Sequence, residues 1–259
     1  MASNPDTPTP TGHEELWRNI LMGIDPRVRR GRARYKHIPH GPRCKMCAVP
    51  FAGPLAPILR MRGHAPWPKN PKYCSMCFGA LTQMHGGAEI PCTLLFADVR
   101  GSTELAERIS SSEFSRLLNG FYDKAARILI ENDAIVDKFV GDEVMAIFIP
   151  ALVQERHAAR AIAAGQEILR AVDELPIGIG IQTGNAFVGA VGEAPHTELT
   201  ALGDVVNTAA RLASAAAAGE ILVSREAADA AGLESGALER RSLELKGKSI
   251  ATDVVVLTT

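Results

Sequence analysis

The 259-residue sequence lacks any run of about 18 apolar residues, the length that predicts a membrane-spanning helix. Residues 1–15 lack a basic segment followed by an apolar core, so they predict a short disordered tail rather than a secretory signal. Neither sign of charge dominates, because the net charge is −1. With 46% hydrophobic and 22% charged residues, the composition is that of an ordinary globular protein, and we expect a cytoplasmic protein with no membrane segment.

The balanced net charge hides an uneven distribution along the chain. Residues 1–90 carry 13 Lys and Arg against 5 Asp and Glu, whereas residues 91–259 carry 15 against 24. Four of the five cysteines also lie in the first part. This segregation predicts parts of different chemistry: a flexible tail with a short helix over 1–25, a four-cysteine module over 26–88, and a larger domain over 89–259.

The four early cysteines form two CxxC pairs, Cys44 with Cys47 and Cys74 with Cys77, separated by 26 residues. Two such pairs supply the four thiolates of a tetrahedral zinc site, which a reducing cytosol favours over disulfides. The segment between them is rich in Pro and Gly, so bound metal would supply much of its folding free energy. An iron–sulfur centre and a redox dithiol remain alternatives. Nearby substitute ligands are His37, His40, His64 and His85.

Two other segments of the N-terminal part have recognisable patterns. Residues 27–36 form a basic run that could contact nucleic acid, but we favour a solvated arm or a surface facing the acidic C-terminal part. Nucleic acid is therefore not expected as a partner. Residues 14–23 place Leu16, Ile20 and Leu21 at helical spacing beside Trp17. They predict a short amphipathic helix that docks on a partner or on the zinc module.

The second part alternates strand and helix patterns in the order of a ferredoxin-like βαββαβ core, so the predicted fold class is α+β. Ser110 and Glu113 are spaced as a capping box that begins a helix, and a Gly-Asp pair marks a hairpin turn. The predicted strands are 91–99, the two arms of a hairpin over 137–148, 177–184, 186–192 and 198–202, and the later predicted helices are 151–174 and 203–216.

In that order of elements, Asp98 ends the first strand and Asp142 lies at the tip of the hairpin. The two carboxylates are predicted to meet at one end of the sheet, as in Mg²⁺ sites that also use substrate phosphates. Between Asp98 and the first helix, the loop 100–103 opens its N–H groups toward a helix N-terminus, which favours a phosphate. Taken singly, Asp98 could be a helix cap and Asp142 a turn residue.

Three segments, FADVRGSTELAE (96–107), DKFVGDEVMAIF (137–148) and TALGDVVNTAARL (200–212), together resemble the class III nucleotidyl cyclases, and the resemblance covers about residues 91–257. It implies two Mg²⁺ or Mn²⁺ ions held by Asp98, Asp142 and the backbone carbonyl of Val99. It also implies that the ribose 3′-hydroxyl attacks the α-phosphorus and that pyrophosphate leaves.

The resemblance assigns further roles. Lys138 would read the purine, and because lysine only donates hydrogen bonds, it favours adenine and hence ATP. Thr200 would be the second purine contact, which both donates and accepts and therefore does not strongly reject guanine. Asn207 would orient the ribose and Arg211 would stabilise charge on the reacting phosphate. The triphosphate contacts would be Gly101, Ser102, Thr103 and Lys246, with Lys248 close enough to replace Lys246.

In this family the metal-binding acids come from one chain, and the purine, ribose and arginine positions come from the other. Since this chain carries both sets, a two-fold homodimer with two composite sites is implied. Our leading hypothesis is an adenylate cyclase whose zinc module supports the dimer or docks a regulatory protein. The alternatives are a nucleotide-binding sensor whose zinc module binds nucleic acid or protein, and a guanylate cyclase.

Overall fold

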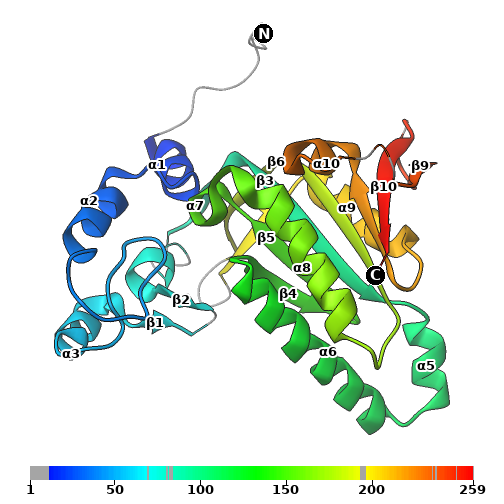
Figure 1. Cartoon of the computed structure of the whole chain (residues 1–259), viewed down its shortest axis with the longest axis horizontal. Helices are drawn as coiled ribbons and strands as arrows, with labels where there is room; N and C mark the ends of the chain where they lie inside the picture. Colours follow the sequence, from blue (N-terminus) through cyan, green and yellow to red (C-terminus); the bar gives the residue numbers. More distant parts are fainter. Residues whose placement is uncertain are drawn as a thin grey trace, which may run out of the picture.

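The protein is described by a computed structural model, which shows a small N-terminal part at one end of a large sheet (Figure 1). The described residues are 12–68, 70–79, 81, 84–192, 197–234, 236, 238–248 and 250–258. Residues 1–11 of the predicted tail lie outside this set, and the prediction is wrong for residues 12–15, which begin a helix (Gly12–Leu21). No helix among the described residues is both long and apolar enough to cross a membrane.

The large sheet has eight strands in the order β4-β5-β3-β6-β8-β10-β9, with β7 beside β6. Its first four strands, with α6 and α8 between them, form the βαββαβ core, which confirms the predicted fold class. The strands are β3 (Gly86–Val99), β4 (Ile135–Val140), β5 (Glu143–Phe148), β6 (Ile177–Val191), β7 (Glu198–Leu202), β8 (Glu220–Ser224), β9 (Arg240–Leu243) and β10 (Thr252–Thr258).

Two strand patterns that the sequence separates are one long strand. Residues 177–184 and 186–192 were predicted as two strands, but β6 runs without interruption from Ile177 to Val191. It continues because β3 pairs with it along the whole length, from Val99 opposite Ile177 to Gly86 opposite Ala190. Side chains therefore alternate along β3: Leu95, Ala97 and Val99 belong to one core cluster, and Leu94 and Phe96 to another.

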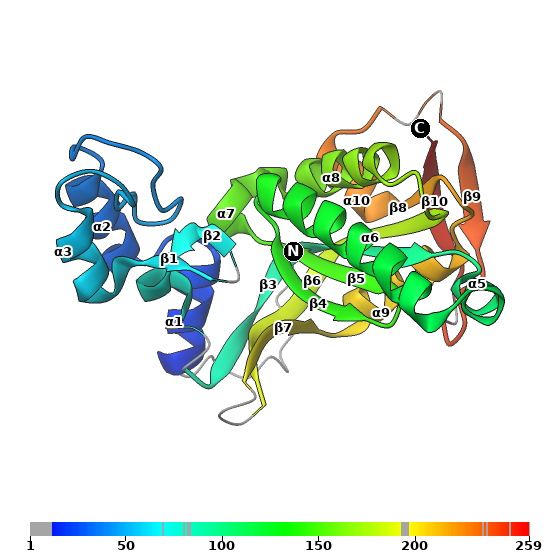
Figure 2. The ribbon, with the colours of Figure 1, turned by 90° about the horizontal axis from the view of Figure 1, so that it is seen from below.

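Helices cover both faces of this sheet, with α6 and α8 on one face and α9 on the other (Figure 2). The hydroxyl of Ser110 caps α6 by accepting from the N–H of Glu113, at 3.2 Å, as predicted. The predicted helix 151–174 is wrong as one element, because Gln154 adopts φ +57° and separates α7 from α8. The helices are α5 (Ser102–Arg108), α6 (Ser111–Glu131), α7 (Pro150–Val153), α8 (His157–Ala171), α9 (Asp204–Ala215) and α10 (Arg225–Ala231), with a helical turn at Gln154–Arg156.

The N-terminal part packs against the near end of β3. Trp17 and Leu21 on α1 are fully buried in the same cluster as Ile90 and Cys92 of β3, so the predicted amphipathic helix docks on the sheet. The basic run forms α2, none of whose residues is buried. The elements here are α1 (Gly12–Leu21), α2 (Pro26–Tyr35), α3 (Ala56–Leu59), β1 (Pro66–Trp67) and β2 (Asn70–Cys74), with helical turns at Arg60–His64 and Ser75–Gly79.

Glycines in β6 let α9 lie directly on the sheet. A Cβ atom at Gly180 would lie 2.2 Å from the backbone nitrogen of Ala213 and 2.3 Å from the carbonyl oxygen of Ala209. Backbone atoms cannot move aside as a flexible side chain can, so a side chain here must displace the helix. The position of α9, which carries Asn207 and Arg211, therefore depends on this contact.

We expect Gly180→Ala to lower the free energy of unfolding by at least about 2 kcal/mol, because it overpacks the β6–α9 contact. The matched control is Gly120→Ala on α6, where an added Cβ meets nothing within 4 Å. The control should raise stability by about 0.5–1 kcal/mol, since alanine is the better helix former. Urea unfolding followed by circular dichroism measures both. Equal effects of the two substitutions would contradict the close packing of α9.

Candidate functional site

The first group of site residues is acidic and lies where β3 and the β4–β5 hairpin end together. Asp98 pairs across the sheet with Glu143, and the N–H of Val99 donates to the carbonyl of Asp142 at 3.3 Å. Asp98 and Asp142, 44 residues apart in the sequence, are thus brought to one end of the sheet, and Glu143 joins them. The carbonyl of Val99 belongs to the same strand end.

The surroundings of Asp98 and Glu143 disfavour the charged forms of these two acids. Burial raises the pKa of Asp98, the neighbouring Asp142 carboxylate raises it further, and Arg100 opposes both. Burial, and then the charges of Asp98 and Asp142, raise the pKa of Glu143 to about 7. Arg100 forms an ion pair with Asp98 and also donates to the carbonyl of Ser214 at 2.7 Å. A crowded, half-buried set of carboxylates is the chemistry that divalent cations stabilise, so the residues fit Mg²⁺ or Mn²⁺.

The second group lies on β4 and β7 and contains the predicted purine contacts. The hydroxyl of Thr200 donates to the carboxylate of Asp137 at 2.6 Å, although the two residues are 63 positions apart. The ammonium of Lys138 lies 3.7 Å from the other oxygen of the same carboxylate. Lys138 and Thr200 therefore both contact Asp137. β4 and β7 are not neighbours in the hydrogen-bonded order of the sheet, yet they lie side by side (Figure 2).

The third group is on α9 and the turn before β10. Asn207 is exposed and Arg211 partly buried, one helical turn apart. Gly247 lies against the Arg211 guanidinium, since a Cβ atom there would be 3.2 Å from Nη2. Lys248 forms an ion pair with Asp204, whereas Lys246 is exposed. Lys246, which precedes Gly247 in the turn, has no ion pair among the described residues, whereas Lys248 has one.

Among the described residues, no hydrogen bond or ion pair joins the acidic group to Lys138, Asn207 or Arg211. The loop residues Gly101, Ser102 and Thr103 begin α5 just after the acidic group, with Gly101 at φ +66°. Their predicted contact with a triphosphate, like the other assigned roles, stays a prediction. One chain thus presents separate parts of a site.

Asp137 and Glu143 have contacts in these groups but are not among the residues that the sequence assigns to the site, and Arg100 is assigned only through its backbone N–H in the loop 100–103. Arg100 and Glu143 directly flank the acidic motifs, so their proximity could have been inferred from the sequence. The contact of Asp137 with the same group as Lys138 could not have been inferred, because neighbouring residues of a regular strand point to opposite faces. The pairing of β4 with β5 shifts between Val136 and Lys138, and this bulge directs Asp137 and Lys138 to the same side.

The four cysteines converge as the CxxC spacing predicts. Their Sγ atoms all lie within 4.8 Å of one another, and those of Cys47 and Cys74 are 3.7 Å apart. Thiolates bound at about 2.3 Å to one tetrahedral ion are about 3.8 Å apart, so the set fits a single zinc ion. A polynuclear iron–sulfur cluster would hold the thiolates further apart. Cys44 also accepts from the N–H of Cys74 at 3.3 Å, and His64 lies 3.5 Å from the Cys74 sulfur.

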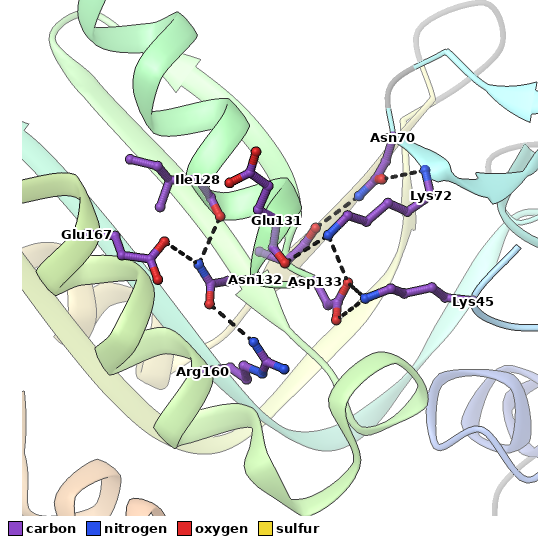
Figure 3. Close-up of polar contacts among 10 residues, drawn as sticks. Lys45, Asn70, Lys72, Ile128, Glu131, Asn132, Asp133, Arg160 and Glu167 are labelled. Atoms are coloured by element: carbon purple, nitrogen blue, oxygen red, sulfur yellow. Dashed lines mark hydrogen bonds and ion pairs between the residues drawn. The ribbon is translucent and has the colours of Figure 1, made fainter. Parts of the chain in front are cut away.

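The four-cysteine module is clamped to the turn between α6 and β4 (Figure 3). Lys45 and Lys72 both form ion pairs with Asp133, whose side chain is only 6% exposed. Lys72 also donates to the carbonyl of Glu131 at 2.8 Å, and Asn70 donates to that of Ala134 at 3.1 Å. The basic module therefore contacts the acidic part directly, at the turn that leads into β4, the strand that carries Lys138.

Comparison with known proteins agrees with this geometry. Residues 88–258 match the family described as the adenylate and guanylate cyclase catalytic domain. The match covers well over half of the chain, and the chain belongs to this family. The solved guanylyl cyclase Cya2 is 30% identical, with a TM-score of 0.62 over 66% of this chain and 93% of that one. The adenylyl cyclase CyaB from P. aeruginosa is 29% identical, with a TM-score of 0.60 over 67% and 96%.

Curated relatives include both enzymes and uncharacterised proteins. The terminal-differentiation-specific adenylate cyclase of Dictyostelium discoideum is 33% identical over 46% of this chain and 6% of its own length. The adenylate cyclase of Anabaena cylindrica is 30% identical over 46% of this chain and 26% of its own. The chain thus spans less than a third of the length of these relatives. Both adenylyl and guanylyl cyclases occur among its neighbours, so membership of the family does not decide between ATP and GTP.

We expect Cys74→Ser to abolish binding of the metal ion at the four-cysteine centre and to lower the melting temperature of the protein, because metal binding and folding are coupled in such modules. Metal analysis of the purified protein measures the first effect and calorimetry the second. Cobalt substitution should give the visible spectrum of a tetrahedral thiolate site in the unsubstituted protein only.

The matched control for this experiment is Cys92→Ala. Cys92 is buried in β3 and is not part of the four-cysteine cluster, so this variant should keep its metal. An unchanged metal content in Cys74→Ser would contradict the tetrahedral site. Bound iron with inorganic sulfide would instead support the iron–sulfur alternative.

Proposed function

We propose that the protein is an adenylate cyclase that converts ATP to 3′,5′-cyclic AMP and pyrophosphate in a homodimer. The observation that supports adenine most directly is the shared contact of Lys138 and Thr200 with Asp137. Adenine presents an acceptor at N1 and a donor at its 6-amino group. The Lys138 ammonium can donate to N1, and the oxygen of the Thr200 hydroxyl beside it can accept from the 6-amino group.

The residues of this chain would divide the chemical work. Asp98, Asp142 and the Val99 carbonyl would hold two Mg²⁺ or Mn²⁺ ions, which when bound supply charge neutralisation for the triphosphate and activation of the 3′-hydroxyl. Asn207 would orient the ribose so that O3′ faces the α-phosphorus. Arg211 would balance the negative charge that grows there while the bond to pyrophosphate breaks.

The triphosphate would be held at its other end by the lysine turn and by the loop before α5. Lys246 is exposed and directly precedes Gly247, which lies against Arg211, so its ammonium could reach the terminal phosphates. Gly101, Ser102 and Thr103 follow the acidic strand and would contribute N–H groups. The proton of the 3′-hydroxyl passes to solvent, and the new O3′–P bond replaces the bond to the leaving group.

Two observations favour a dimer. The acidic group makes no polar contact with the other two groups among the described residues, so a second chain would complete each site. The catalytic part also exposes large apolar side chains near the purine group, with Phe139 44%, Val140 57% and Leu202 49% exposed. Burying apolar surface of this kind is the usual driving force of homodimerisation.

The four-cysteine module, holding one structural zinc per chain, would support the dimer or dock a regulatory protein. Its ion pairs with Asp133 support this role, because they fix the turn that begins β4. A cytoplasmic location and the boundaries 1–25, 26–88 and 89–259 stay predictions.

The purified protein should form cyclic AMP from ATP with Mn²⁺ or Mg²⁺, and Asp142→Ala should lower that rate at least about 100-fold through loss of metal binding. Chromatography of the products after incubation with ATP or GTP is the measurement. Glu155→Ala, a surface change in the turn after α7, is the control and should leave the rate unchanged. Preferential formation of cyclic GMP would support a guanylate cyclase instead. Nucleotide binding without turnover would support the sensor.

Mixing two inactive variants tests the composite site. Asp142→Ala removes an acid, and Arg211→Ala removes the arginine from the partner's half of the site. After unfolding and refolding together, half of the dimers should be mixed, each with one intact site. Recovery of about a quarter of the wild-type activity is expected for a two-fold dimer with shared sites. No recovery, with mixed dimers present by mass spectrometry, would show that each chain carries its own complete site.

A further inference from the structure

Asp137 is a buried acid at an unusual position in the sheet. It is the extra residue of a bulge in β4, since Val136 pairs with Ala146 and Lys138 with the next residue, Met145. A bulge re-aims a side chain and recurs next to functional sites. The Asp137 side chain is fully buried, although it is an acid and its neighbours Val136 and Lys138 are partly exposed.

Among the described residues, the groups that hydrogen-bond or form an ion pair with the Asp137 carboxylate are donors, while Glu198 adds a negative charge to its surroundings. One oxygen accepts from the Thr200 hydroxyl at 2.6 Å, and the Ala201 N–H also faces the carboxylate. The other oxygen has no hydrogen bond within the part of the chain that the structure describes, and it lies 3.7 Å from the Lys138 ammonium. Burying an acid without full pairing is costly, so a purely structural role is better served by an apolar residue.

The Thr200 hydroxyl has a single proton, and the bond to Asp137 uses it. Burial raises the pKa of Asp137, whereas the Thr200 hydroxyl, the Lys138 charge and the Ala201 N–H oppose that rise by stabilising the ionised form. The ionised carboxylate can only accept, so the hydroxyl donates inward to it. The lone pairs of the Thr200 oxygen are then left for any other partner. A threonine without such a partner can donate or accept, whereas the bond to Asp137 leaves the Thr200 oxygen only as an acceptor toward a ligand.

We propose that Asp137 is a positioning residue that sets the purine preference by fixing the Thr200 hydroxyl as an acceptor beside the donating Lys138 ammonium. This inference rests on the proposed function in one respect, that the purine lies against Lys138 and Thr200. Asp137 itself does not touch the nucleotide. It acts through the direction of one hydrogen bond and through the placement of one ammonium.

The resulting pair of contacts matches adenine and opposes guanine. Adenine offers its 6-amino donor to the Thr200 oxygen and its N1 acceptor to Lys138. Guanine offers an acceptor, O6, where Thr200 also accepts, and a donor, N1–H, where Lys138 also donates. Both contacts are mismatched for guanine, and mismatched polar groups in a desolvated pocket are the strongest means of rejecting a substrate.

The decisive variant is Asp137→Asn, which keeps the shape of the side chain and removes its charge. An amide offers an N–H₂ group as well as an oxygen, so the Thr200 hydroxyl is no longer compelled to donate inward. Its proton becomes available to O6 of guanine. The preference for ATP over GTP should fall roughly 10- to 100-fold, the range for losing one directed hydrogen bond to a charged group. Asp137→Ala should shift the preference in the same direction.

Three controls separate this effect from a loss of structure. Glu198→Gln removes a negative charge from the surroundings of Asp137 without touching Thr200, and it should leave the preference unchanged. Thr200→Ser keeps the hydroxyl and should also preserve it. In a Thr200→Val background the hydroxyl is absent, so adding Asp137→Asn should cause no further change in the ATP-to-GTP ratio.

Two readouts are made on the full-length protein: kcat/KM for ATP and for GTP, and competition of each nucleotide against a fluorescent ATP analogue. A lower ratio in Asp137→Asn that disappears in the Thr200→Val background supports the proposal. An equal loss for both purines, or a wild-type protein that binds both purines equally, would overturn it. If the wild type binds ATP without forming cyclic AMP, the proposed activity is wrong. The ratio of the affinities for ATP and GTP, compared between the wild type and Asp137→Asn, then still tests the role of Asp137.

Discussion

The antiparallel ladder between β3 and β6 is the constraint on which the rest of the structure depends. It runs from Gly86 opposite Ala190 to Val99 opposite Ile177, a length of about 45 Å at the usual rise per residue. Its near end receives α1, and its far end carries Asp98. Because side chains alternate along it, the same strand anchors α6 and α8 on one face and α9 on the other. The three groups of site residues are positioned by elements fixed to this ladder.

Two buried acids organise the short stretch between α6 and the tip of the hairpin. Asp133 accepts two lysines from the four-cysteine module, and Asp137 accepts the Thr200 hydroxyl from β7. They lie four residues apart, one in the turn before β4 and the other within it. Each carboxylate joins segments that are distant in the sequence. Because both carboxylates are buried, removing their partners would cost more free energy than at the surface. The strand β4, which carries Lys138, is thus fixed by the four-cysteine module at its beginning and by β7 along its length.

Much of the fold could be predicted from local pattern. The order of strands and helices, the cap of α6 at Ser110, and the convergence of the cysteines all follow from spacing that is visible in the sequence. The continuity of β6 could not be predicted, because Gly184 and Asn185 are typical of a turn and only pairing with β3 keeps them extended. The break at Gln154 likewise has no local signal, since glutamine is a good helix former.

For the candidate site, the sequence predicts which residue types gather but not how they face one another. The partnership of Lys138 with Thr200 follows from resemblance, whereas their common contact with Asp137 depends on a bulge. A bulge is a property of two paired strands and is not encoded by β4 alone. The ion pair between Arg100 and Asp98 also depends on tertiary structure, because Arg100 reaches the carbonyl of Ser214 at the end of α9 at the same time.

The burial of α1 determines where the catalytic segment of this chain can be excised without exposing its core. The family match begins at residue 88, yet Trp17, Ile20 and Leu21 share one apolar core with Ala88, Ile90 and Val188. A catalytic segment excised at the family boundary would leave that patch facing water, where it invites aggregation. The unit that recombination or a designer could transplant intact is therefore larger than the segment that matches the family, and it includes α1.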